Sequence, residues 1–125
     1  MAWKGKWFFA VGVIHSLFGL AFMKTTLAVL WSERLFNTVN GQPTREAVFW
    51  FLYTGFLLLI IGVLIDQTER HRLAVPWFVV WAFVLLTVVG LIVMPISGIW
   101  LLLPPVVGFA ISGWKTKHNA AGVQQ

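Results

Sequence analysis

The sequence contains no cysteine and very few charged residues. The lack of cysteine excludes disulfides, thiolate catalysis and cysteine-ligated zinc or iron–sulfur sites. Only 10% of the residues are charged, whereas a soluble domain carries about 25%. The chain therefore cannot cover a water-facing surface. Because 59% of the residues are hydrophobic, intrinsic disorder is excluded as well. The class that fits this composition is an integral membrane protein.

The net charge of +5 does not point to a nucleic-acid partner. The nine Lys and Arg residues are spread along the whole chain and form no basic run. No glycine-rich turn precedes a basic residue, so a nucleotide loop is not expected. His15 is the only histidine inside an apolar stretch, which leaves too few ligands for a metal site. We therefore expect no nucleic acid, no metal and no cofactor.

Four apolar stretches cover most of the chain, at residues 7–23, 47–65, 73–94 and 96–114. Each is long enough to cross a hydrocarbon core of about 30 Å, which takes roughly 17–25 helical residues. The alternation of polar and apolar residues that marks a membrane β-barrel is absent. The prediction is an all-α, polytopic membrane protein, with four transmembrane helices in one bundle that forms a single domain over residues 1–125.

The distribution of cations predicts how these helices are oriented. An even number of spans places both termini on one side of the membrane, and we expect the first span to be retained rather than cleaved as a secretory signal. The positive-inside rule then places both termini in the cytoplasm. The side with the termini holds the six cations Lys4, Lys6, Arg70, Arg72, Lys115 and Lys117, and the other side holds Lys24, Arg34 and Arg45.

The long loop between the first two spans predicts a short helix in the outer interface. Leu27, Trp31, Leu35 and Val39 repeat every four residues, as on one face of a helix, and Gly41 would end that helix. Alternatively, the first span runs on to Trp31 while Lys24 reaches outward to the headgroups. We prefer the interfacial helix.

In the first span, the ionisable residue shares a helix face with the small residues. At 100° per residue, Gly12, Ser16 and Gly19 fall within about 100° of His15. Small residues allow helices in lipid to approach closely. We therefore expect His15 to point into the bundle, close to mid-depth.

The second and fourth spans carry the other candidate features. Glu46, Trp50 and Tyr53 share one side of the second span, with Thr54 on the flank, and Gly55 and Gly62 lie opposite. In the fourth span, the adjacent prolines remove two backbone donors and are expected to kink the helix. These are Pro104 and Pro105.

Together these positions predict an outward-facing cavity for a small lipophilic or amphiphilic molecule. Its mouth would lie at Arg45, Glu46 and Trp100, and it would end near His15. The predicted ligand-binding residues are His15, Arg45, Trp50, Tyr53, Thr54, Ser97 and Trp100.

Three functions remain open at this point. The first is binding or handling of such a molecule. The second is a membrane enzyme in which His15 or Glu46 is catalytic, through acid–base chemistry such as an isomerisation, cyclisation or ring opening. The third is a structural subunit whose glycine-lined faces serve assembly. A homo-oligomer is expected under all three, because four short spans bury little surface.

Both catalytic candidates also have a structural interpretation. His15 can be a neutral imidazole that is bonded to Ser16, Tyr53 or Thr54 across a helix interface. Glu46 can lie in the first turn of a helix whose N-cap is Thr44, where the helix dipole favours a carboxylate.

Several motifs resemble a bacterial family of small four-helix inner-membrane proteins of unassigned function. They are the run Arg45-Glu46-Ala47-Val48-Phe49-Trp50-Phe51-Leu52-Tyr53-Thr54-Gly55, the segment Met94-Pro95-Ile96-Ser97-Gly98-Ile99-Trp100, and Pro104-Pro105. The resemblance covers nearly the whole chain and implies a multi-pass protein of the bacterial inner membrane, but no established activity. In architecture the chain is also similar to DoxX-like four-helix membrane proteins, some of which accompany quinone-linked redox enzymes.

Overall fold

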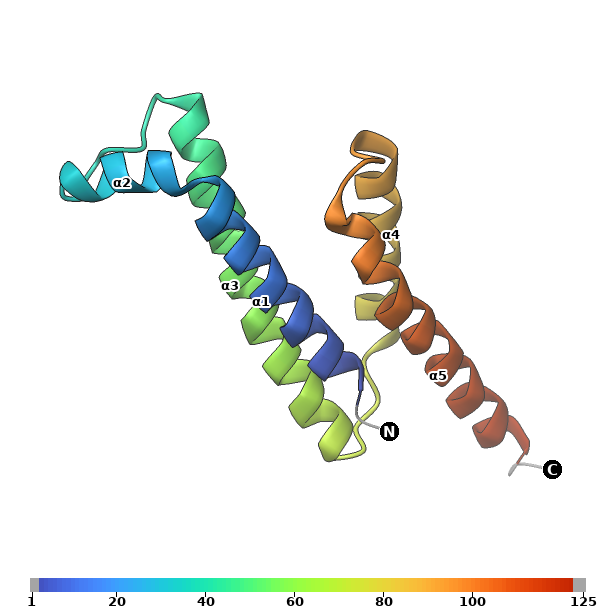
Figure 1. Cartoon of the computed structure of the whole chain (residues 1–125). Coiled ribbons are helices and arrows are strands. Elements are labelled where there is room, and N and C mark those ends of the chain that lie inside the picture. The colour runs from blue at the N-terminus through green and yellow to red at the C-terminus, as the bar shows by residue number, and fades with distance from the viewer. Residues whose placement is uncertain (1–2, 123–125) are drawn as a thin grey trace.

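The computed structural model describes residues 3–122, with side chains for residues 3–115, and this part of the chain is helical without strands. Figure 1 shows the helices in chain order. They are α1 (Lys4–Phe22), α2 (Lys24–Ser32), α3 (Pro43–Arg70), α4 (Trp77–Val93), the 3₁₀ helix η1 (Gly98–Leu102) and α5 (Leu103–Gly122).

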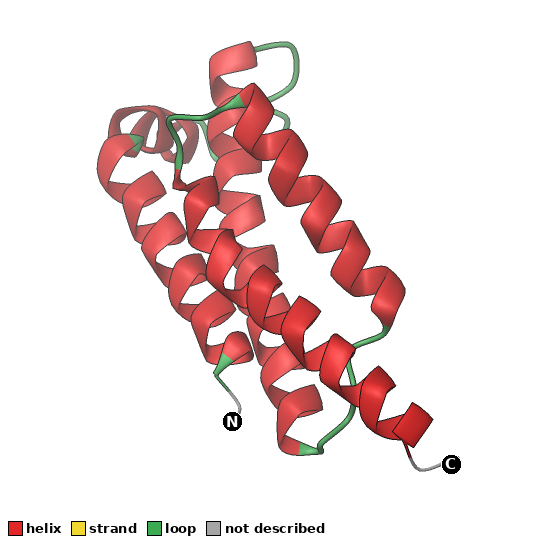
Figure 2. Ribbon diagram, turned by 90° about the vertical axis from the view of Figure 1, so that its right-hand side faces the viewer, coloured by secondary structure: helices red, strands yellow, loops and turns green. Residues whose placement is uncertain are grey.

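The helices α1 and α3 form a tight antiparallel hairpin (Figures 1 and 2). Its contact surface is lined by the small residues of both helices: Gly12 lies against Leu59, Gly55 against Ser16, and Gly62 against Phe9. Because glycine has no side chain, the two backbones can approach closely, which favours helix association in lipid. The predicted packing faces of the first two spans are confirmed.

An ion pair closes the hairpin at the end that carries the N-terminus. The Lys4 ammonium donates to Glu69 Oε1 at 2.8 Å, and both side chains are largely buried, with 11% and 10% exposed. The backbone N–H of Gly5 donates to the other carboxylate oxygen of Glu69 at 3.2 Å. Glu69 thereby satisfies one of the free donors in the first turn of α1 and ties it to the end of α3.

The helices α4, η1 and α5 form a second hairpin that packs on α1. The ring of Phe8 lies 5.1 Å from that of Phe83 and 6.2 Å from that of Phe109, between centroids. The indole N–H of Trp7 donates to the carbonyl of Leu101 at 2.8 Å. Figure 1 shows the two hairpins diverging from this contact toward the α2 end of the molecule.

The third apolar stretch is shorter as a helix than predicted, and the fourth becomes helical later than predicted, from Gly98. In the described part of the chain, three helical segments are long and apolar enough to cross a membrane, namely Lys4–Phe22, Pro43–Arg70 and Gly98–Lys115, and α4 is a shorter apolar helix. The prediction of helix from residue 73 is wrong, because residues 73–76 are not helical and Pro76 immediately precedes α4. The residue before a proline is disfavoured in helical conformation, which accounts for the late start.

The expected kink at the paired prolines is also wrong. Residues 94–97 are not helical, η1 follows them, and α5 begins at Leu103. Pro104 and Pro105 therefore stand in the first turn of α5, where a missing N–H costs nothing. The two carbonyls that they leave free find other donors, since Trp100 accepts from the N–H of Leu103 and Leu101 accepts from Trp7.

The helix in the long loop ends at Ser32 rather than at Gly41. α1 breaks at Met23, and α2 turns across the end of the hairpin (Figure 1). Arg34 then adopts a left-handed backbone with φ of 65°. The N–H of Leu35 donates to the carbonyl of Leu30, and that of Arg34 to the carbonyl of Trp31, both at 3.1 Å. This pair of bonds is a Schellman motif, which stops the helix before the predicted apolar repeat is complete.

Candidate functional site

His15 lies in the middle of α1 and is held against the backbone of α3. Its Nε2 lies 2.9 Å from the carbonyl oxygen of Phe51, and its ring stacks on the Phe51 ring at 3.9 Å between centroids and 14° between planes. A carbonyl can only accept, so Nε2 carries the proton. None of the three partners expected from the sequence makes this bond.

The tautomer determines what the other edge of the imidazole offers. The Cδ2 atom of His15, next to Nε2, lies against Gly55, so this edge of the ring faces α3. Nδ1 is on the opposite edge, and no hydrogen bond to it occurs within residues 3–115. A neutral imidazole with its proton on Nε2 has a lone pair on Nδ1. His15 is partly exposed and can therefore accept a hydrogen bond from another molecule.

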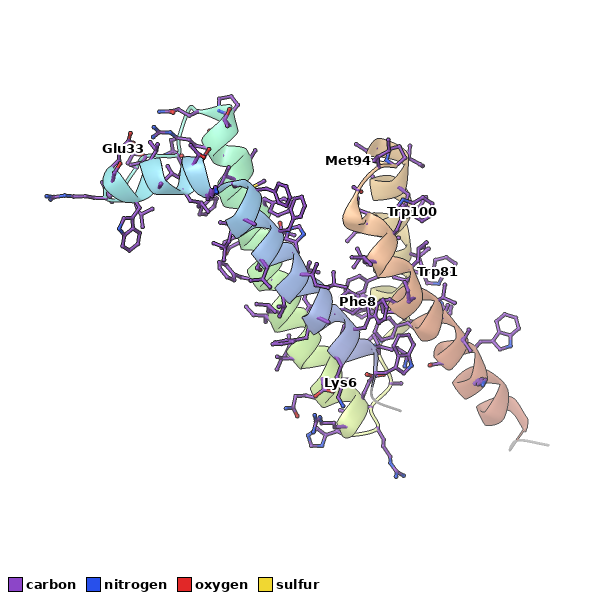
Figure 3. All side chains as sticks on the ribbon, viewed as in Figure 1. Lys6, Phe8, Glu33, Trp81, Met94 and Trp100 are labelled. Atoms are coloured by element: carbon purple, nitrogen blue, oxygen red, sulfur yellow. The ribbon has the colours of Figure 1, made fainter. Side chains whose placement is uncertain are left out.

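The helical repeat indicates the direction in which His15 points. His15 follows Phe8 by seven residues, which is about two turns and roughly 10 Å of rise, so both side chains share a face of α1. Phe8 contacts Phe83 of α4 and Phe109 of α5, and Figure 3 shows it between the two hairpins. His15 thus lies on the same face of α1 as Phe8, about two turns nearer to α2.

Two phenylalanines beside His15 were not among the candidates from sequence. Phe51 supplies both the stacking ring and the accepting carbonyl, and Phe18 lies 6.1 Å from the Phe51 ring. The antiparallel pairing of Gly19 with Phe51 and Leu52 brings them to this level. The signal available in the sequence was the register of the glycines on the two helices, which places residues 51–55 opposite His15.

Tyr53, Trp50 and Thr54 lie at the expected level but do not contact His15. The Tyr53 ring stacks on Phe49 at 5.6 Å and meets Trp50 edge-on at 5.7 Å. Both Tyr53 and Trp50 are exposed, and they lie on the side of α3 away from the buried Gly55. The Thr54 hydroxyl donates to the carbonyl of Trp50 at 2.8 Å. These three side chains face away from α1.

Arg45 and Glu46 are engaged with the loop that precedes α3. Arg45 donates to both carboxylate oxygens of Glu33, at 2.6 and 3.0 Å, and to the carbonyl of Thr38 at 2.8 Å. Glu46 accepts from the backbone N–H of Gly41 at 2.9 Å. Thr44 is not the N-cap of this helix, because Pro43 is its first residue and Gln42 precedes it.

Ser97 and Trp100 make local contacts at the start of η1. The Ser97 hydroxyl donates to the carbonyl of Met94 at 2.7 Å, and the Trp100 indole donates to the carbonyl of Pro95 at 2.8 Å. Figure 3 shows Trp100 on the second hairpin, while Glu33, which binds Arg45, lies at the far end of the first. The residues of the predicted cavity mouth are thus not brought together, and His15 stands apart from them.

Comparisons with known proteins place the chain in a family without assigning an activity. No curated protein and no solved structure matches it. The model of one family matches residues 1–116, which is nearly the whole chain. With its apolar helices and a match over nearly its whole length, this chain belongs to the family of unknown function DUF6463.

Proposed function

We propose that this protein binds a small lipophilic molecule that carries a hydroxyl or another hydrogen-bond donor, between its two hairpins and beside His15. The observation that supports this is the bond from Nε2 to the Phe51 carbonyl, because it leaves Nδ1 as an acceptor in the middle of an apolar helix. A polar atom in an apolar environment is costly unless it is hydrogen-bonded. A lipophile with a hydroxyl supplies that bond and fills apolar space at the same time.

The surroundings of His15 suit the apolar part of such a ligand. Phe51 stacks on the imidazole and Phe18 lies near the Phe51 ring, while the rings of Phe8, Phe83 and Phe109 (the Phe8 cluster) pack together about two turns toward the N-terminal end. Aromatic and aliphatic walls with one convergent polar group are typical of small-molecule sites. In this proposal Tyr53, Trp50, Ser97 and Trp100 are not ligand contacts, because their rings or hydroxyls point elsewhere or are already bonded.

Binding is favoured over the two other functions that the sequence left open. Acid–base turnover needs a second proton-transfer group. Glu46 is bonded to Gly41 and precedes Phe51, which marks the level of His15 on α3, by five residues. A purely structural role was predicted for the glycine-lined faces, but α1 and α3 use these faces on each other. Neither observation favours an enzyme or an assembly subunit.

The test compares a long-chain alcohol bearing a diazirine with its methyl ether, which cannot donate. Both probes are added to the full-length protein in phospholipid nanodiscs and crosslinked by light. A hydrogen bond contributes about 1 kcal/mol, so we expect the alcohol to label the protein about fivefold more strongly than the ether. His15→Phe keeps an aromatic ring against Phe51 and should abolish the difference.

Tyr53→Phe is the matched control, since it removes a hydroxyl at the same level on the outward side of α3. It should leave the preference for the alcohol unchanged. Equal labelling by the two probes in the unmodified protein, or a preference that survives in His15→Phe, would rule out His15 as the polar contact.

We also propose that α1, α3, α4 and η1–α5 all cross a bacterial inner membrane, with both termini in the cytoplasm. The asymmetry of six cations against three supports this orientation. α4 has 17 residues, at the lower end of the range that spans a bilayer. We also propose that the protein forms a homo-oligomer.

A further inference from the structure

The end of α2 and the loop that joins it to α3 carry large apolar side chains that are exposed. Phe36 is 92% exposed, Trp31 76% and Leu35 53%. Lys24 and Arg34 of the same segment are exposed as well. We refer to Lys24, Trp31, Arg34, Leu35 and Phe36 as the loop surface. No other described part of the molecule covers it.

The backbone under this surface is strained and is fixed by several hydrogen bonds. Arg34 and Leu35 adopt left-handed conformations with φ of 65° and 63°, which cost about 1 kcal/mol or more each for residues with a side chain. The N–H of Phe36 donates to the carbonyl of Arg34 at 2.7 Å, a three-residue γ-turn centred on Leu35. Leu35 at the centre of this turn and Phe36 after it are both exposed.

The bonds that offset this strain come from within the protein. The Schellman motif at the end of α2 satisfies two carbonyls, and the bidentate pair between Arg45 and Glu33 closes the loop from the other side. Thr38 adds a bond from its hydroxyl to the carbonyl of Leu35 at 3.1 Å. The exposed conformation of Leu35 and Phe36 therefore does not require a protein partner to hold it.

The position of the loop surface indicates its partner. α1 has 19 residues, about 28 Å of helix, which matches a hydrocarbon core of about 30 Å. α2 begins immediately after α1 and turns across the end of the hairpin (Figure 1). This segment thus lies at the height of the lipid headgroups when α1 spans the bilayer. Aromatic side chains favour that zone, and Lys and Arg there pair with phosphate.

We propose that the loop surface docks on the phospholipid leaflet at the α2 end of the molecule. Phe36, Leu35 and Trp31 insert below the headgroups. Arg34 and Lys24, which form no ion pair with a described residue, bind lipid phosphate. This inference rests on the proposed crossing of the membrane by α1 and α3, but not on the ligand at His15.

The experiment measures depth with a spin label on single cysteines, since the chain has no cysteine of its own. Full-length Phe36→Cys, Leu35→Cys and Gln42→Cys are placed in nanodiscs of phosphatidylethanolamine and phosphatidylglycerol. Collisions with oxygen report lipid, and collisions with a water-soluble nickel chelate report water. We expect the ratio of oxygen to nickel accessibility to be at least threefold higher at positions 35 and 36 than at the exposed position 42. Adding Arg34→Ala to Phe36→Cys should lower its ratio.

A label at Leu17, which is exposed on α1, distinguishes failure of the docking inference from failure of the proposed membrane crossing. If the label on Leu17→Cys lies deep in lipid while positions 35 and 36 are as accessible to nickel as position 42, the docking inference fails alone. If Leu17→Cys is itself accessible to water, the crossing of the membrane fails. Labels at 35 and 36 that are immobile and shielded from both reagents would indicate a protein interface and would also overturn lipid docking.

Discussion

At the scale of single residues, glycine controls how closely α1 and α3 pack. A Cβ added at Gly62 would lie 2.5 Å from the backbone nitrogen of Phe9 and 2.8 Å from its Cα. A backbone atom cannot rotate out of the way as the end of a side chain can. The two helices would have to separate to accept a single methyl group.

We predict that Gly62→Ala destabilises the protein by up to about 2 kcal/mol. Alanine favours a helix over glycine by about 1 kcal/mol, but overpacking against backbone costs roughly 1–3 kcal/mol, so the penalty prevails. Unfolding in mixed micelles with increasing dodecyl sulfate measures the change. Gly98→Ala is the control, because a Cβ there meets nothing within 4 Å. Equal stability of the two variants would contradict close packing at Gly62.

His15 shows the limit of prediction at the residue scale. Its face and its level could be predicted from helical periodicity and from the placement of Gly12, Ser16 and Gly19. Its partner could not, because the acceptor is the backbone carbonyl of Phe51. Every residue has such a carbonyl, so no residue type marks it, and only the crossing of α1 and α3 selects this one.

At the scale of elements, α2 and α3 both end in a Schellman motif. Arg34 and Arg72 both occupy the left-handed position that glycine usually takes in a Schellman motif. Neither end is therefore marked by a glycine in the sequence. The predicted end of the helix at Gly41 lies nine residues beyond its actual end at Ser32. The stop signal was a backbone conformation stabilised by hydrogen bonds, not a residue type.

The ion pair between Glu33 and Arg45 makes the loop sensitive to acid. The hydrogen bond from Arg45 holds the pKa of Glu33 below its ordinary value of 4.5. A lowered pKa means that the pair contributes fully above pH 4.5 and is lost as the pH falls through the folded value. We predict that a spin label at Phe36→Cys becomes more mobile as the pH falls from 6 into this acid range.

Glu46 also faces this loop, through the N–H of Gly41, so its contribution must be separated. In the background of Phe36→Cys, Glu33→Gln should give a label that is already mobile at pH 6 and changes little on acidification. Glu46→Gln should retain the transition. A transition that is lost in Glu46→Gln and kept in Glu33→Gln would show that Glu46, and not Glu33, is the carboxylate that responds to acid.

At the scale of the whole molecule, two hairpins are joined mainly at one end. The Phe8 cluster and the bond from Trp7 to Leu101 lie toward the N-terminal end of α1, close to the ion pair of Lys4 with Glu69. Beyond them the hairpins diverge toward α2 (Figure 1). The bundle predicted from four apolar stretches is thus two helix pairs in contact over part of their length. The similarity in architecture to DoxX-like proteins stays a prediction.

The proposed orientation predicts opposite accessibility at the two ends of the first hairpin. In intact bacteria, a membrane-impermeant maleimide that crosses only the outer membrane should label Gln42→Cys and leave Lys6→Cys unlabelled. Both side chains are exposed in the structure, so a difference reports the membrane rather than burial. After the cells are broken, both cysteines should react. Labelling of Lys6→Cys in intact cells would reverse the orientation.

The sequence by itself determined that this chain is built of apolar helices and which faces of α1 and α3 meet, because hydropathy and helical periodicity are local properties of neighbouring residues. It also marked His15 as the ionisable residue in the middle of an apolar helix. The tertiary structure alone decided that the indole of Trp7 satisfies the carbonyl freed by Pro105. It also decided that Nε2 of His15 is hydrogen-bonded, while Nδ1 has no hydrogen bond to any described side chain or backbone group. These features depend on register and crossing between segments far apart in the chain, which no local pattern encodes.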